Sequence, residues 1–302
     1  MNDAATADLP RFQAGMPPQH LITTLLGDYW FEREEHLPSA ALVRLAGEFG
    51  VSAVAARAAL SRLTRRDLLE SSKIGRRTYY RLTDRAAAML SQGVHRVVSF
   101  GLDREPWDGH WAVAGFSIPE DQRALRHPLR TRLRWLGFAP LYDGLWVSPT
   151  ARPEAVVAAL SELKVCNATV FRATAEEAAW LRSPHEAWDF DLLRRGYDDF
   201  LARYEPLLAR VRQGTVGAAE ALVARSELMD AWRAFPGLDP GLPAELLPAD
   251  WPRGRARAVF AEIYDTLGPL AEIRVRQIVA EFDADLAALV RHHSTATLLA
   301  AA

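Results

Sequence analysis

The chain has 302 residues, a hydrophobic content of 49%, a charged content of 25% and a formal net charge of −2. These values are typical of a globular protein with two or three domains, and the lack of any apolar run of about 18 residues excludes a membrane-spanning helix. The single cysteine, Cys166, excludes an intramolecular disulfide and indicates a reducing compartment, so we expect a cytoplasmic protein.

The chain begins with a polar stretch that carries Asp3, Asp8 and Pro10 before any apolar run. This pattern is not that of a signal peptide, and we expect a flexible leader over residues 1–19. From residue 20 to 32, apolar side chains recur at helical spacing, which predicts the first helix of an N-terminal domain.

Residues 40–66 have the pattern of two short helices separated by a tight turn. Apolar residues at helical spacing predict the first helix, and Gly50 ends it because glycine adopts positive φ freely. Ser52 can accept a hydrogen bond from a free N–H at the start of the next helix, which runs to about Arg66. This order predicts a helix-turn-helix.

A basic two-stranded hairpin is expected directly afterwards, over residues 71–80. Gly75 occupies the turn, and the return strand is rich in residues that favour strands. A hairpin in this place is the wing of a winged helix-turn-helix. Between Val51 and Arg81, eight Lys or Arg residues accompany only two acids, in a chain that is nearly neutral. A local basic excess of this kind favours phosphate binding.

The second helix and the hairpin are therefore predicted to form a DNA-binding surface. Small Ala and Ser side chains on the outer side of the helix would let it approach a major groove closely. A solvated, Arg-rich helical hairpin with no role in DNA binding is the alternative. The candidate DNA-binding residues are Ser52, Ala53, Arg57, Ser61, Arg62, Arg65, Lys73, Arg76, Arg77 and Tyr79.

A helix over residues 83–99 is expected to lead out of this domain, which we place at residues 20–100. Residues 107–173 then show the order strand, helix, strand, strand, helix, strand, which predicts a ferredoxin-like domain. Its first helix has a leucine at i, i+4, i+8 and i+11 from Leu125, and Asp143-Gly144 predicts a hairpin. We expect its core to contain Trp111, Trp135 and Trp146, and its last strand to bury Cys166.

Residues 174–302 are expected to be helical, which makes the whole chain an α+β protein. We predict that this third domain joins two subunits and contributes to effector binding.

Motifs spread over almost the whole chain resemble the PaaX-type repressors of phenylacetic acid degradation and their relatives. They are Arg57 with Arg62-Leu63, Gly75-Arg76-Arg77 with Tyr79-Tyr80-Arg81-Leu82-Thr83, Trp107-Asp108-Gly109 with Trp111, Leu133 with Trp135-Leu136-Gly137-Phe138, Gly144-Leu145-Trp146-Val147-Ser148-Pro149, and Leu246-Leu247-Pro248-Ala249-Asp250-Trp251-Pro252. The resemblance implies a homodimeric regulator of transcription, usually a repressor, that binds double-stranded operator DNA. It also implies an N-terminal winged helix, a middle domain similar to the CRISPR-associated Cas2 fold and a helical C-terminal domain.

The same resemblance implies a small effector such as an aryl-acetyl-CoA thioester or an aromatic catabolite, without assigning its contacts. Arg126, Arg130 and Arg134 form a row opposite the leucines of one helix, and guanidinium groups pair well with phosphate. A solvated face, or pairing with the acids between Glu186 and Asp199, is the alternative for this row. Trp188 and Trp232 are candidates for an aromatic pocket, with core packing as the alternative.

A Cas2-like metal-dependent nuclease is the alternative function. Metal-dependent cleavage of a phosphodiester requires carboxylates that hold the cations beside the scissile phosphate. The first strand of the middle domain, residues 111–118, contains no acid. We therefore expect a regulator that is not an enzyme and that has no metal site, no cofactor and no membrane association.

Overall fold

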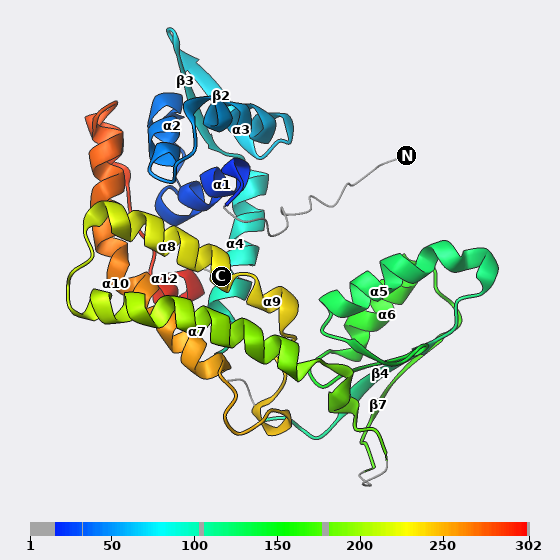
Figure 1. Ribbon diagram of the computed structural model, residues 1–302. Helices are drawn as coiled ribbons and strands as arrows, with labels where there is room; N and C mark the ends of the chain where they lie inside the picture. Colours follow the sequence, from blue (N-terminus) through cyan, green and yellow to red (C-terminus); the bar gives the residue numbers. More distant parts are fainter. Residues whose placement is uncertain (1–15, 32, 103–105, 177–180, 301–302) are drawn as a thin grey trace. The chain divides into compact units, whose positions relative to one another are not determined.

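The computed structural model describes residues 16–31, 33–102, 106–176 and 181–300. Its chain folds into two compact units, shown in Figure 1. The first unit comprises Met1–Ser99, Leu201–Arg233 and Ala258–Ala302, and the second comprises Phe100–Phe200 and Ala234–Arg257. The sequence predicted a division along the chain at 20–100, 107–173 and 174–302, whereas residues from the C-terminal third belong to both units.

The first unit begins with three helices and a three-stranded sheet. Helix α1 (Pro18–Tyr29), strand β1 (Leu37–Pro38) and helix α2 (Ser39–Gly47) precede α3 (Ala53–Arg65), β2 (Leu69–Ile74) and β3 (Arg77–Leu82). The strands are antiparallel in the order β1-β3-β2. This sequence of elements is the one expected for a winged helix-turn-helix, with α1 starting two residues earlier than expected. Most of the expected leader lies outside the described residues.

Local chemistry sets the turns of this segment. Gly50 has a φ of 73°, a left-handed conformation that only glycine adopts without strain, and it separates α2 from α3. Ser52 accepts a hydrogen bond from the Ala55 backbone N–H at 3.2 Å and so caps α3. Gly75, with a φ of 58°, turns the β2–β3 hairpin. The sequence predicted each of these three roles.

The remaining helices of the first unit come from distant parts of the chain. They are α4 (Asp84–Ser99), α8 (Ala218–Trp232), α11 (Ala284–Leu289) and α12 (Thr295–Ala300), with the later part of α7 (Phe190–Arg212) and most of α10 (Arg253–Ala280). Trp232 is fully buried, stacks on Phe260 with ring centroids 4.9 Å apart, and donates from Nε1 to the Val97 carbonyl oxygen at 3.1 Å. These contacts fasten α8 to α10 and to α4.

A buried ion pair joins α1 to the later helices. The Arg225 side chain is 0% exposed, and its Nη1 donates to Asp28 Oδ2 at 3.3 Å and to the Tyr29 hydroxyl at 3.1 Å. Its Nε donates to the Tyr264 carbonyl oxygen at 3.1 Å, and its Nη2 donates to the His293 carbonyl oxygen at 2.6 Å. The Tyr264 hydroxyl in turn donates to Asp28 Oδ1 at 3.0 Å. The Arg225 guanidinium and the Asp28 carboxylate are thus both buried, and most of their donors and acceptors have hydrogen-bond partners within the protein.

The second unit contains a four-stranded antiparallel sheet with two helices on one face (Figure 1). Its elements are β4 (Trp111–Phe116), η1 (Glu120–Leu125), α5 (Arg126–Trp135), β5 (Ala139–Tyr142), β6 (Leu145–Ser148), α6 (Pro153–Glu162) and β7 (Ala168–Ala173). The strand order β5-β6-β4-β7 is the ferredoxin-like arrangement expected from the sequence. Leu129 and Leu133 of the leucine stripe are fully buried against the sheet.

The other face of this sheet buries a second apolar cluster. Trp111, Val113 and Val147 pack there against Trp188 and Leu246. Trp188 follows η2 (Pro184–Ala187), and Leu246 ends η3 (Ala244–Leu246), while α9 (Phe235–Leu238) also belongs to this unit. Segments of the C-terminal third therefore complete the core of the second unit.

Two expectations about buried residues were wrong. Trp135 is 66% exposed, because it follows the buried Leu133 by two residues and so lies on the opposite side of α5. Cys166 is exposed, because the chain turns at Lys164 (φ of 54°) and β7 starts only at Ala168. Within the described residues, no helix combines the length and the apolar character that a membrane span requires.

We predict that Asp28→Ala strongly destabilises the first unit. Removal of the carboxylate leaves the Arg225 guanidinium buried without its counter-ion, which costs about 3–5 kcal/mol of unfolding free energy. Urea unfolding followed by circular dichroism measures this change. Glu220→Ala is the matched control, because it breaks the exposed Arg210–Glu220 pair (2.6 Å) and should cost less than about 1 kcal/mol. Equal effects of the two substitutions would contradict a structural role for the buried pair.

Candidate DNA-binding surface

Helix α3 has one buried side and one side exposed to solvent. Ala56, Leu60 and Leu63 are buried against the other helices of the segment. On the opposite side the candidates Ser52, Ala53, Arg57, Ser61 and Arg65 are exposed, and Arg62 is half-buried at the edge. Helical spacing therefore gathers the predicted residues of α3 on one accessible face.

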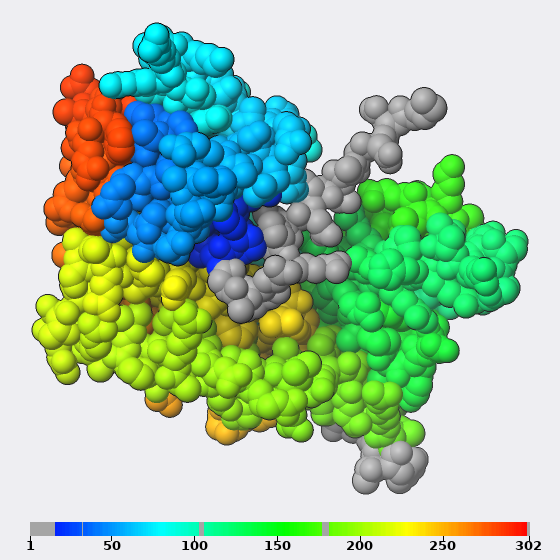
Figure 2. All heavy atoms as spheres, turned by 45° about the horizontal axis from the view of Figure 1, so that its top comes forward, coloured from blue at the N-terminus to red at the C-terminus, as the bar shows by residue number. Residues whose placement is uncertain are grey.

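The β2–β3 hairpin projects from the helices of the first unit (Figures 1 and 2). Lys73, Arg76 and Arg77 are exposed around the turn at Gly75. Tyr79 is different. Only 9% of it is exposed, because it lies on the central strand opposite Pro38 of β1. We therefore exclude the Tyr79 ring from the surface, although the sequence predicted it as a DNA contact.

The cations of this face share a property that most other arginines of the chain lack. Within the described residues, the structure gives no ion pair to Arg57, Arg62, Arg65, Lys73, Arg76 or Arg77. At the base of the hairpin, Arg81 is paired with Glu70 and Asp84. We call the six residues the unpaired cationic face. Because no carboxylate neutralises it, its positive potential is available to an external polyanion.

Exposed arginines elsewhere are mostly neutralised by acids. Examples are Arg212 with Glu262 at 2.6 Å, Arg203 with Glu227 at 2.8 Å and Arg210 with Glu220 at 2.6 Å. Arg212 lowers the pKa of Glu262 through its hydrogen bond, as Arg210 lowers that of Glu220, so both acids stay ionised at neutral pH. The unpaired cationic face is therefore a place where six neighbouring positive charges are left without such acids.

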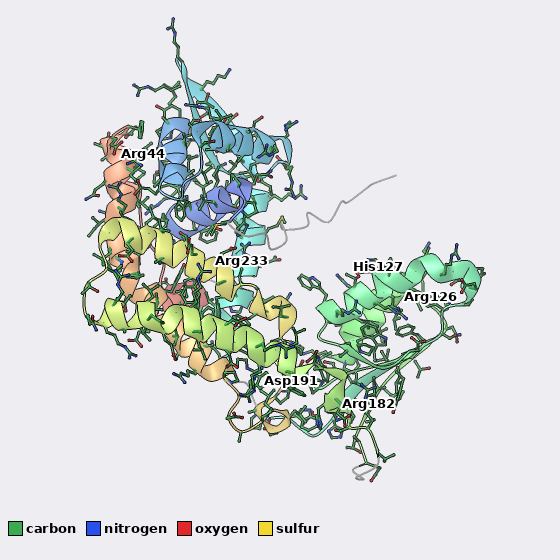
Figure 3. All side chains as sticks on the ribbon, viewed as in Figure 1. Arg44, Arg126, His127, Arg182, Asp191 and Arg233 are labelled. Atoms are coloured by element: carbon green, nitrogen blue, oxygen red, sulfur yellow. The ribbon has the colours of Figure 1, made fainter. Side chains whose placement is uncertain are left out.

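The arginine row of α5 is partly paired with local acids. Arg126 lies on this helix (Figure 3). It forms an ion pair with Glu120 at 2.9 Å and donates to the Ile118 carbonyl oxygen at 3.3 Å. Arg130 lies 3.5 Å from Asp143, and the Arg134 guanidinium lies over the Trp146 ring, 5.5 Å from its centroid. The acids that pair with the row are therefore Glu120 and Asp143. The sequence analysis had instead named the acids between Glu186 and Asp199 as possible partners.

A pocket of about 280 Å³ lies beside this row, between α5 and the β5–β6 hairpin. Trp146 lines it and is almost fully buried, and its indole Nε1–H has no hydrogen-bond partner in the described part of the chain. A buried donor without a partner is costly and uncommon in a folded protein. The lining residues are Arg130, Arg134, Pro140, Leu141, Tyr142, Asp143 and Trp146.

The two tryptophans predicted for an effector pocket do not line a common one. Trp232 belongs to the core of the first unit. Trp188 belongs to the second unit, where it stacks on Trp111 with ring centroids 6.1 Å apart. Their aromatic character marked core positions, which was the alternative interpretation of the sequence. The pocket at Trp146 was missed because it depends on strands that approach only in the folded chain.

Carboxylates, histidines and the cysteine are dispersed over the structure. Among residues 16–31, 33–102, 106–176 and 181–300, no three His, Cys, Asp or Glu side chains gather where they could share a metal ion. Within the described residues, the first unit exposes helix α3 and the hairpin, which together carry the unpaired cationic face.

Three family models match successive stretches of the chain. A model described as PaaX-like protein matches residues 18–86, the PaaX protein central Cas2-like domain matches residues 104–183, and the PaaX-like protein C-terminal domain matches residues 188–277. The transcriptional repressor PaaX of Escherichia coli (strain K12) is 28% identical over 258 residues, which are 83% of this chain and 80% of that protein. The chain belongs to the PaaX-type family.

A solved structure supports the fold over nearly the full length. The uncharacterized protein Rv0674 from Mycobacterium tuberculosis superimposes with a TM-score of 0.58 and 23% sequence identity. The similarity covers 88% of this chain and 99% of that one. The fold is therefore the α+β arrangement with a Cas2-like central domain that the sequence predicted.

Proposed function

We propose that this protein is a transcriptional repressor that binds operator DNA through the unpaired cationic face. The observation that carries the proposal is the set of six cations without ion-pair partners on α3 and the hairpin. A chain with a formal net charge of −2 has no general attraction for nucleic acid. Its binding must therefore come from this local concentration of positive charge. The similarity to a protein named a transcriptional repressor supports the same conclusion.

The two elements of the face suit different parts of the DNA. Helix α3 is capped by Ser52 and exposes small side chains at Ala53 and Ser61, so its backbone can approach base edges in the major groove. The hairpin carries Lys73, Arg76 and Arg77 on a projection that can reach the phosphates beside the groove. We assign base recognition to α3 and phosphate contacts to the hairpin.

Arg57→Ala is expected to lower affinity for the operator by about tenfold to a hundredfold, because an arginine that reaches a guanine edge contributes roughly 1–3 kcal/mol of discrimination. Fluorescence anisotropy on a site selected from random duplexes measures this loss. Arg195→Ala is the matched control, since Arg195 is an exposed arginine on α7 in the second unit. Undiminished binding by Arg57→Ala, or an equal loss in Arg195→Ala, would refute the assignment.

Arg76→Ala should weaken binding to all sequences alike. Loss of one phosphate contact reduces the slope of log K against log salt concentration by about one unit. Titrations at four salt concentrations, with both the selected site and an unrelated duplex, give this slope. A changed base preference with an unchanged slope would mean that the hairpin reads sequence.

We infer that the protein binds DNA as a homodimer, because one helix-turn-helix covers only one half-site and two-fold pairing is the usual route to a specific site. The selected site should then contain an inverted repeat whose halves lie about 34–36 Å apart or a multiple of that distance. Sedimentation of the protein–DNA complex gives the stoichiometry. One chain per site without an inverted repeat would contradict the dimer.

A small effector, an acyl-CoA thioester or an aromatic catabolite, is proposed to relieve repression from the pocket beside Trp146. Arg134, which has no carboxylate partner within the described residues, offers its guanidinium group to a phosphate or carboxylate, and Arg130, paired with Asp143 at 3.5 Å, lines the same pocket. Tyr142, which is 56% exposed, offers aromatic surface, and Trp146 is part of the lining although its side chain is almost fully buried. Arg126, the third residue of the predicted row, does not line this pocket, and its guanidinium pairs with Glu120.

Calorimetry with an aryl-acetyl-CoA should show that Arg134→Ala weakens effector binding at least fivefold, because the pocket loses one charge-assisted contact. Arg126→Ala, on the same helix but outside the pocket, should leave effector binding unchanged. Addition of operator DNA should weaken effector binding by the same factor by which effector weakens operator binding. Equal effector affinity with and without operator would exclude ligand-driven release.

A metal-dependent nuclease is the less favoured function, because β4 carries no carboxylate that could hold a cation beside a phosphodiester. Metal-dependent cleavage of plasmid DNA by the purified protein would reverse this preference. As a repressor of chromosomal operators, the protein would act inside the cell, in the cytoplasm.

A further inference from the structure

Val54 is the most exposed large apolar side chain in the described part of the chain, with 77% of its surface open to solvent. It stands in the first turn of α3, between the cap residue Ser52 and Arg57. The inference below rests on the proposed function, since it concerns what α3 does on DNA.

The exposed valine contributes little to the fold. Its neighbours Ala53 and Ala55 are small, and so much of the side chain is exposed that it cannot pack in a core. A β-branched residue also favours a helix less than alanine does, because the preceding turn restricts its χ1 angle. The structure thus leaves the two γ-methyl groups without a structural use.

Val54 shares a face with the proposed base-reading residues. Arg57, Ser61 and Arg65 follow it at i+3, i+7 and i+11, so all four project from the same side of α3. Val54 is the residue of this row nearest the N-terminus of the helix, the end that meets base edges when a helix-turn-helix docks.

The charges around Val54 determine which partner can cover it. A second copy of this chain would bring the same unpaired cations against the face, and like charges would oppose that contact. A polyanion is attracted, and the major groove of DNA also presents one apolar group, the C5-methyl of thymine. We propose that Val54 packs against a thymine methyl group and makes the protein select thymine at one position of each half-site.

The test removes the methyl group from the DNA and the matching methyl groups from the protein. Each thymine of the selected site is replaced in turn by deoxyuridine, which keeps all hydrogen-bonding groups of the base. Affinities are measured for the wild type, for Val54→Ala, and for the control Val157→Ala, an exposed valine of α6 in the second unit. Both substitutions place alanine in a helix, so both variants are expected to fold.

In the wild type, deoxyuridine should weaken binding about fourfold at one thymine of each half-site, the factor that burial of one methyl-sized group gives. Val54→Ala should bind the thymine site about fourfold more weakly than the wild type does, which is the same loss that deoxyuridine causes in the wild type. In Val54→Ala, replacing that thymine by deoxyuridine should cause no further loss. Val157→Ala should behave as the wild type. A double-mutant cycle compares the affinities of the wild type and of Val54→Ala for the thymine site and for the deoxyuridine site. It isolates the energy of the contact between Val54 and the thymine methyl group.

Two results would overturn the proposal: a wild type that ignores deoxyuridine at every position, or a Val54→Ala variant that keeps the wild-type response at every position. Both differ from failure of the proposed function, in which no sequence is enriched from random duplexes. The Arg57→Ala variant helps to distinguish failure of the Val54 proposal from failure of the proposed function. This variant should lose affinity for the selected site but keep the wild-type response to deoxyuridine.

Discussion

The buried pair of Arg225 and Asp28 is the constraint on which the first unit depends. The two residues are separated by 197 positions in the sequence, and both are almost completely removed from solvent. The guanidinium also lies 3.7 Å from the centroid of the Tyr264 ring, so its charge is stabilised by an aromatic face as well as by the carboxylate. Such a pair is favourable only in one geometry, because any displacement leaves a buried charge without its partner. It therefore fixes α1 on α8 and α10.

The fixed α1 has a consequence for the DNA-binding surface, because α1 packs directly against α3. The helix that we assign to base recognition is thus held, through α1, on helices contributed by the last third of the chain. The helix-turn-helix is part of a larger unit and not an appended small domain. Helix α1 also packs against α8, so a displacement of α8 that moves α1 would reach α3 through that helix.

Short-range patterns predicted much of the fold, since helices and turns are set by neighbours in sequence. Gly50, Ser52 and Gly75 could be recognised because their roles depend on local dihedral angles and one nearby N–H. The predictions that were wrong, and the features that were missed, concern residues whose surroundings come from distant segments of the chain. Burial of Tyr79 depends on pairing with β1, and Trp188 is covered by the sheet of the second unit. Arg225 could not be recognised as a core residue because its partner Asp28 lies in a helix at the other end of the sequence.

Electrostatics and shape have separate tasks on the proposed surface. The unpaired cations attract any DNA, and their contribution falls with salt because it comes from counterion release. They cannot choose a sequence, since phosphates are the same at every base pair. A chain with a net charge of −2 has no general attraction for DNA, so the cationic face also determines how the protein is oriented on arrival. Once α3 is in the groove, only side chains that reach base edges discriminate. Arg57 can recognise a hydrogen-bonding edge and Val54 an apolar one, and together they define a site more narrowly than charge alone could.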